Sequence, residues 1–159
     1  GLTEVGTIFA LYKTVSEEEI KMNTIILASH GALSQGLKQT AEMILGPATN
    51  IFALSAYRDE DEPIEQQIQS IVSKLGKENL FILTDILGGS VNNEMIGLLK
   101  KEPAIRLITG MNLPLVISIA TQVNPIAAAD LELIIEESRQ SLIDCNRLLK
   151  KSNEGGDDL

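Results

Sequence analysis

Short runs of apolar residues alternate along the chain with longer segments in which apolar residues recur at the spacing of a helix. The runs occupy residues 24–28, 51–54, 80–84 and 105–109. An unbroken run of this length is typical of a buried strand, and apolar positions three and four residues apart are typical of an amphipathic helix. The pattern therefore predicts four strands, separated by segments long enough to be helices.

Turn residues mark the ends of these helices. Gly46 and Pro47 stop the helix that begins near Leu33, whereas Pro63 opens the next helix and Gly76 ends it. A third helix follows the glycines that come after residue 84, and it runs through Leu99. The chain thus contains three consecutive strand-helix units.

Beyond the fourth strand the pattern changes. Asn112-Leu113-Pro114 starts an apolar segment that runs through Ala120, and Asn124-Pro125 breaks the chain. Residues from Asp130 to Lys150 then predict one long amphipathic helix. Its inward side chains are expected to be Leu131, Ile134, Ile135, Leu142, Ile143 and Leu149.

Wholly apolar strands that alternate with helices are typical of a parallel sheet covered on both faces. We therefore predict a doubly wound α/β fold with a mostly parallel sheet of four to five strands. This domain spans residues 22–150. Residues 1–21 form an N-terminal extension of unknown role, and residues 151–159 form a flexible tail.

Composition narrows the class of partner. The chain carries 13 basic and 22 acidic residues, a net charge of −9, and this balance disfavours nucleic acid and favours a basic protein. No apolar run reaches the roughly 18 residues that span a bilayer, and no signal peptide is evident, so we expect a cytoplasmic protein. Cys145, the single cysteine, is expected to be a buried, inert thiol.

The single histidine directly follows the first predicted strand. His30 occurs in Ala28-Ser29-His30-Gly31, and Asp85 follows the third strand. Taken singly, His30 could be a surface residue and Asp85 a helix cap, but parallel strands bring such residues to one edge of the sheet. A carboxylate that accepts a hydrogen bond from Nδ1–H would leave Nε2 as the nucleophile and stabilise the cationic ring. The pair therefore predicts a phosphohistidine site.

A glycine turn lies close to Asp85. Gly88-Gly89-Ser90 opens a helix, and its backbone N–H groups, the helix N-terminus and the Ser90 hydroxyl could cradle a phosphoryl group. By itself, such a turn is more often a tight strand-to-helix connection. The Lys of a nucleotide-binding loop and the glycine spacing of a dinucleotide site are both missing, which disfavours a nucleotide.

Other chemistries fit less well. One histidine and one cysteine do not make a typical zinc site, so no metal and no cofactor are predicted. No Gly-x-Ser-x-Gly motif is present for acyl transfer. The charged run from Asp59 to Glu62 is expected to be a solvated loop.

Four motifs in register resemble the IIA component of mannose-type phosphotransferase systems, the mannose, fructose and sorbose family, from about Met22 to Lys150. They are Ser29-His30-Gly31, Thr40-Ala41-Glu42-Met43-Ile44-Leu45-Gly46, Asp85-Ile86-Leu87-Gly88-Gly89-Ser90 with Asn93, and Gly110-Met111-Asn112-Leu113-Pro114. Two positions depart from the family: Val91 stands where proline is common, and Leu87 where an aromatic residue is frequent.

This resemblance implies a phosphocarrier. His30 would accept phosphate from HPr on Nε2 and pass it to a histidine of the IIB component, which phosphorylates a sugar imported through the membrane subunits IIC and IID. Asp85 would orient the ring, and Gly88, Gly89 and Ser90 would contact the phosphoryl group. The family forms homodimers in which an edge strand can be exchanged, which directs attention to residues 113–127 for dimer contacts.

The sequence is also compatible with two alternatives. One is the phosphocarrier subunit of a dihydroxyacetone kinase, which shares the fold and the histidine, although Asp85 and Ser90 argue against it. The other is a non-catalytic regulatory module of the same shape.

Overall fold

The computed structural model describes residues 23–56, 62–122 and 125–155, which form four strands and six helices. These are β1 (Thr24–His30), α2 (Leu33–Leu45), β2 (Ile51–Ala56), α3 (Ile64–Leu75), β3 (Leu80–Thr84), α4 (Ser90–Lys101), β4 (Arg106–Thr109), α5 (Leu113–Ala120), α6 (Ala128–Gln140) and α7 (Cys145–Gly155). The four strands and the first three helices lie where the apolar pattern predicts them.

All strand pairs are parallel, and the strand order is β2-β1-β3-β4. The chain passes from β1 outward to β2 and then crosses back to place β3 on the other side of β1. In doubly wound sheets ligands bind in the crevice at the carboxyl ends of the strands where the order reverses, which here are β1 and β3. The predicted doubly wound α/β fold is confirmed, with a four-stranded sheet.

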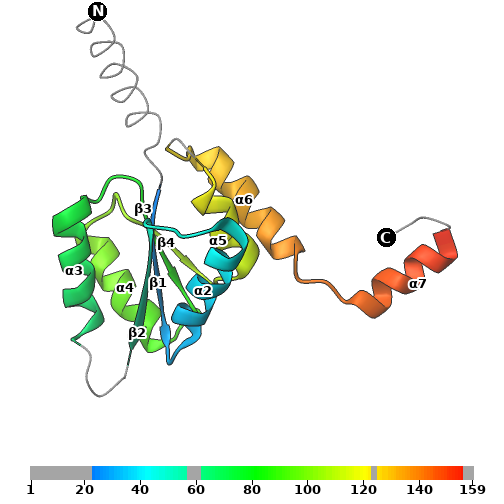
Figure 1. Ribbon diagram of the computed structural model, residues 1–159, viewed down its shortest axis with the longest axis horizontal. Helices are drawn as coiled ribbons and strands as arrows, with labels where there is room; N and C mark the ends of the chain where they lie inside the picture. Colours follow the sequence, from blue (N-terminus) through cyan, green and yellow to red (C-terminus); the bar gives the residue numbers. More distant parts are fainter. Residues whose placement is uncertain (1–22, 57–61, 123–124, 156–159) are drawn as a thin grey trace, which may run out of the picture.

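Helices cover both faces of the sheet (Figure 1). Helices α3 and α4 pack on one face, and α2, α5 and α6 pack on the other. The two central strands lie between both layers, so every residue of β3 is buried. This explains why the central strands are apolar throughout instead of alternating between apolar and polar residues.

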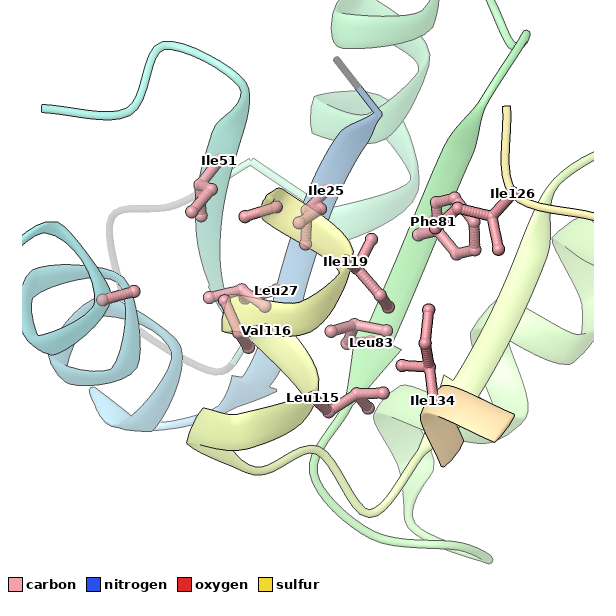
Figure 2. Close-up of a cluster of buried hydrophobic side chains, with 12 residues drawn as sticks. Ile25, Leu27, Ile51, Phe81, Leu83, Leu115, Val116, Ile119, Ile126 and Ile134 are labelled. Carbon is pink, nitrogen blue, oxygen red and sulfur yellow. The ribbon is translucent and has the colours of Figure 1, made fainter. Parts of the chain in front are cut away.

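Figure 2 shows one of the two buried side-chain clusters, the one that lies under α5. Leu115, Val116 and Ile119 of this helix point onto Ile25 and Leu83 of the two central strands. Each Å² of apolar surface that these side chains bury stabilises the fold by roughly 25 cal/mol. This burial holds the helix on the sheet.

Helix α5 accounts for part of the segment in which we expected dimer contacts. The Asn112 side chain accepts a hydrogen bond from the Leu115 N–H at 2.9 Å and so caps the first turn. Pro114 lies in that turn, where its missing N–H costs nothing. Residues 113–120 are therefore a helix packed into the chain's own core.

The single long helix predicted from Asp130 to Lys150 is wrong, because the chain forms two helices with residues 141–144 between them. Asp144 is the physical reason: its Oδ1 accepts hydrogen bonds from the N–H groups of Asn146, at 3.1 Å, and Arg147, at 3.3 Å. A side chain that caps the N-terminus in this way begins a new helix.

The break also changes which side chains face the core. Ile134 is buried as expected, and Leu131 and Ile135 are partly buried against the core. Leu142, Ile143 and Leu149 do not face inward, and Leu142 is 91% exposed. In Figure 1, α7 extends away from the sheet and its covering helices.

Two further expectations about this end of the chain need correction. Cys145, expected to be buried, is exposed, since it is the first residue of α7. The predicted tail is partly helical, since α7 continues through Gly155. None of the helices in the described ranges is long and apolar enough to cross a membrane.

The N-terminal extension and most of the charged run, from Asp59 to Asp61, lie outside the described residues.

Two substitutions distinguish core from surface. Leu83→Ala removes a fully buried side chain from a central strand and should lower the free energy of unfolding by about 2–5 kcal/mol. Met43→Ala changes a side chain that is 82% exposed on α2 and should alter it by less than about 0.5 kcal/mol. Urea unfolding followed by circular dichroism measures both. Equal losses would contradict the assignment of the core.

Candidate functional site

His30 is the last residue of β1, at the carboxyl edge of the sheet where the strand order reverses. Its side chain is 44% exposed, in contrast to the five buried residues that precede it in the strand. The strand therefore holds the backbone of His30 rigidly while the ring faces the solvent.

Asp85 follows β3, the neighbour of β1, and contacts His30 twice. Its Oδ2 accepts hydrogen bonds from the His30 backbone N–H at 2.9 Å and from the ring at Nδ1, 2.7 Å away. Its Oδ1 accepts the Ile86 N–H at 3.0 Å. The structure thus brings the two predicted residues together, and the carboxylate assigns the ring proton to Nδ1.

The same contacts keep Asp85 ionised. Burial of this side chain, which is 12% exposed, raises the pKa of the carboxyl, but the hydrogen bonds from the His30 backbone, the His30 ring and the Ile86 N–H together outweigh it. The pKa of Asp85 is therefore lowered from its ordinary value. A carboxylate that stays charged can balance positive charge on the imidazole.

Ser90 contacts the other ring nitrogen. It is the first residue of α4, and its Oγ lies 3.1 Å from His30 Nε2. With the ring proton on Nδ1, Nε2 accepts this hydrogen bond and the serine hydroxyl donates it. The ring is thus held from both sides, by the end of β3 and by the start of α4.

The two glycines allow the ring and the turn to lie close together. Gly88 has φ of +79°, a conformation that favours glycine. A Cβ at Gly89 would lie 2.9 Å from Ile86 Cγ2 and 3.4 Å from His30 Cε1, so a side chain here would displace its neighbours. The Gly89 N–H donates to the Ile86 carbonyl at 3.3 Å. Phosphoryl binding by Gly88, Gly89 and Ser90 stays a prediction.

Two buried serines fix the end of β1, a role that sequence reasoning missed. Ser29 Oγ accepts a hydrogen bond from the Ser34 N–H at 2.8 Å, and Ser34 Oγ donates to the Leu54 carbonyl of β2 at 2.8 Å. Both serines are fully buried. The sequence signal for this role is a serine at a core-facing position of each flanking element, Ser29 in β1 and Ser34 in α2.

A second buried pair was also missed. Thr84 and Asn92 join the end of β3 to the first turn of α4 through a hydrogen bond of 2.6 Å between their side chains. Both look unremarkable in sequence, because threonine is common in strands and Asn92 stands next to a second asparagine. Their contact depends on tertiary structure.

In the ranges that the structure describes, no three His, Cys, Asp or Glu side chains come together as a set that could hold a metal ion.

Comparison with known proteins identifies the class of protein. Residues 24–135 match the family model EIIA-man, described as the PTS system fructose IIA component. The fructose-specific EIIA component of Bacillus subtilis (strain 168) is 24% identical over 140 residues, which cover 86% of this chain and 96% of that protein. The sorbose-specific EIIA component of Klebsiella pneumoniae is 29% identical over 107 residues, 67% of this chain and 78% of that protein.

Solved structures agree. The PTS IIA protein associated with the fucose utilization operon of Streptococcus pneumoniae superposes with a TM-score of 0.70 at 28% identity, over 80% of this chain and 96% of that chain. The fold and the matches define a phosphotransferase-system IIA component. The chain belongs to the EIIA-man family, as the four sequence motifs indicated.

The lowered pKa of Asp85 predicts how acid affects stability. A carboxyl whose pKa is lower in the folded protein stabilises it above the ordinary value of 3.8, and this contribution is lost as the pH falls through the lowered value. The difference in unfolding free energy between the unmodified protein and Asp85→Asn should therefore be fully present above pH 3.8 and shrink as the pH falls further below that value. Urea unfolding at a series of acid pH values measures it, and a constant difference would contradict the assignment.

Proposed function

We propose that this chain is a phosphocarrier that accepts a phosphoryl group from phospho-HPr on His30 Nε2 and donates it to a histidine of a IIB component. Membership of the EIIA-man family supports the reaction class. The observation that carries the proposal on this chain is the line of hydrogen bonds from Asp85 through both nitrogens of the exposed His30 ring to Ser90.

The geometry suits nucleophilic attack by Nε2. Nδ1 holds the ring proton toward Asp85, so the lone pair of the neutral imidazole lies on Nε2. The bond between phosphorus and the donor nitrogen breaks as the bond between phosphorus and Nε2 forms, and no proton has to leave the ring. The ring gains positive charge, which the Asp85 carboxylate balances from 2.7 Å.

Ser90 serves both states of the ring. Before transfer its hydroxyl donates to Nε2 and holds the ring in place. During attack this hydrogen bond must break, and the hydroxyl can turn to a phosphoryl oxygen bound at the same nitrogen. The N-terminus of α4 begins at Ser90 and favours the negative charge that arrives.

The surface around His30 suits a protein partner. Ile86 is 60% exposed and Leu87 is 73% exposed, on the loop that follows Asp85. Ile86 reaches the neighbourhood of the His30 ring, since both approach the Cβ position of Gly89. A partner can cover these side chains while it brings its own histidine to Nε2. The partners would be HPr and the IIB protein in the cytoplasm, with the membrane subunits IIC and IID downstream.

The first experiment is phosphorylation by the general proteins of the pathway. Incubation with phosphoenolpyruvate, enzyme I and HPr should add one acid-labile phosphate per chain, and His30→Ala should abolish it. Ser138→Ala serves as the matched control, because this buried serine bonds to the Ile134 carbonyl of its own helix, α6. Mass spectrometry at neutral pH measures the phosphate. Labelling that survives His30→Ala would contradict the proposal.

The acceptor separates the proposal from its alternatives. Phosphorylated chain should transfer its phosphate to a IIB protein. Transfer to a dihydroxyacetone kinase subunit instead, or a phosphate that no IIB protein removes, would favour the kinase subunit or the regulatory module.

We also propose that the chain is a homodimer held by its C-terminal segment, residues 141–149. Apolar side chains of this segment face solvent, among them Leu142, Ile143, Leu148 and Leu149. In α5, by contrast, Leu115, Val116 and Ile119 are buried in the chain's own core.

Charge supports a second copy of this chain as the partner of α7. The helix carries three basic residues and one acidic residue: Arg147, Lys150, Lys151 and Glu154. The exposed face of α6 carries the acidic residues Glu132, Glu136 and Glu137 and one base, Arg139, which pairs with Glu136 at 3.6 Å, so the face is acidic on balance. Basic α7 of one copy and acidic α6 of another are complementary.

Replacing two leucines of α7 tests the dimer. Leu148→Ser combined with Leu149→Ser should convert the protein to a monomer, because serine does not gain from burial in an apolar contact. Leu75→Ser, at a side chain 52% exposed on α3, should leave the dimer intact. Light scattering after size exclusion measures the mass. A monomeric unmodified chain, or an unaffected double variant, would contradict this arrangement.

A further inference from the structure

We infer that Thr84 and Asn92 form a positioning pair: their buried hydrogen bond sets the separation between Asp85 and Ser90 and thereby holds the His30 ring at both nitrogens. This inference rests on the proposed function for its kinetic consequence, but its structural content stands on the hydrogen bonds themselves.

The two groups that hold the ring come from different elements. Asp85 directly follows β3, and Ser90 begins α4. A change in the separation of these elements would lengthen one of the two hydrogen bonds to His30 or rotate the ring. Whatever joins the end of β3 to the start of α4 therefore controls where Nε2 points.

The loop between them joins the two elements weakly. Ile86 and Leu87 are exposed and add little packing. The Gly89 N–H reaches the Ile86 carbonyl at 3.3 Å, and Asn93 Nδ2 reaches the Gly88 carbonyl at 3.4 Å. Both distances are beyond the usual range for strong hydrogen bonds of this kind.

The bond between Thr84 and Asn92 is short and shielded from water. Thr84 Oγ1 donates to Asn92 Oδ1 at 2.6 Å, and the two residues are 0% and 1% exposed. Thr84 immediately precedes Asp85, and Asn92 is two residues after Ser90 in the first turn of α4. The bond therefore bridges the same two elements as the His30 contacts, one layer deeper in the protein.

The bond between Thr84 and Asn92 lies in apolar surroundings, which penalise its loss. The first turn of α4 also buries Val91, and Met95 follows on the same helix, so Asn92 lies within an apolar layer. A buried amide without a partner costs free energy, which favours the arrangement in which the bond is made. The backbone of Thr84 is held as well, because its carbonyl accepts the Met111 N–H at 3.0 Å.

Four variants separate positioning from mere stability. Thr84→Val removes the hydroxyl and leaves Asn92 Oδ1 unpaired, whereas Thr84→Ser keeps the hydroxyl. The double variant Thr84→Val with Asn92→Leu replaces both polar groups by apolar ones, which restores stability without restoring the directional bond. Ser138→Ala removes a buried serine hydroxyl far along the chain and serves as the matched control.

Two measurements apply to each variant. The first is the rate of phosphoryl transfer from phospho-HPr, resolved into kcat and KM. The second is the NMR shift of the Nδ1 proton in the unphosphorylated protein, which is unambiguous because His30 is the only histidine. Urea unfolding accompanies both, so that loss of stability is recorded separately.

Thr84→Val should lower kcat on the order of tenfold with KM for HPr nearly unchanged, because a small displacement of a reacting atom costs about this much or more. It should also move the Nδ1 proton signal. Thr84→Ser and Ser138→Ala should leave kcat and the Nδ1 proton signal close to those of the unmodified protein. The double variant should have the unfolding free energy of the unmodified protein but keep the low kcat of Thr84→Val.

An unchanged kcat and proton signal in folded Thr84→Val, or recovery of both in the double variant, would overturn the inference. A His30 that takes no phosphate in the unmodified chain would overturn the proposed function instead. The Nδ1 proton signal then still decides whether Thr84 and Asn92 position the ring.

Discussion

The parallel pairing of β1 with β3 is the constraint on which the site depends. It places the carboxyl ends of the two strands side by side, so that Asp85 can reach both the backbone N–H and the ring of His30. One carboxylate oxygen thereby fixes the position of the residue and the orientation of its side chain. Ser90 can then meet the opposite nitrogen, because α4 starts from the turn that follows β3. The rest of the fold buries these strands and keeps their ends in register.

Much of this arrangement could be predicted from the order of residues along the chain. Apolar runs locate the four strands because central parallel strands are covered on both faces. The side chains of His30 and Asp85 follow two such runs, and topology alone then brings them to one edge. A periodic pattern and the residue that follows it are local information, which is why this part of the prediction was reliable.

The C-terminal region shows where local information fails. Apolar residues continue at helical spacing beyond Gln140, yet Asp144 caps a new helix and the periodicity no longer reports burial. Leu142 and Leu149 are exposed although their spacing matches that of the buried Ile134. The buried pairs Ser29 with Ser34 and Thr84 with Asn92 were missed for the opposite reason: each residue is ordinary by itself, and only the folded chain brings the partners together. Charge and periodicity do not encode such contacts.

The exposure of the His30 ring has a consequence for timing. Nearly half of this side chain faces water, and the described elements leave it at an open edge of the sheet. Under the proposed function, a phosphoryl group on His30 would be exposed to hydrolysis until the next partner binds, so the lifetime of the phosphorylated protein would limit the time available for transfer. A closed pocket would lengthen that lifetime but would keep a second protein out. The open edge would admit a partner protein at the cost of a shorter lifetime of the phosphorylated state, and the abundance of the proposed acceptor would then govern how much phosphate is delivered and how much is lost to water.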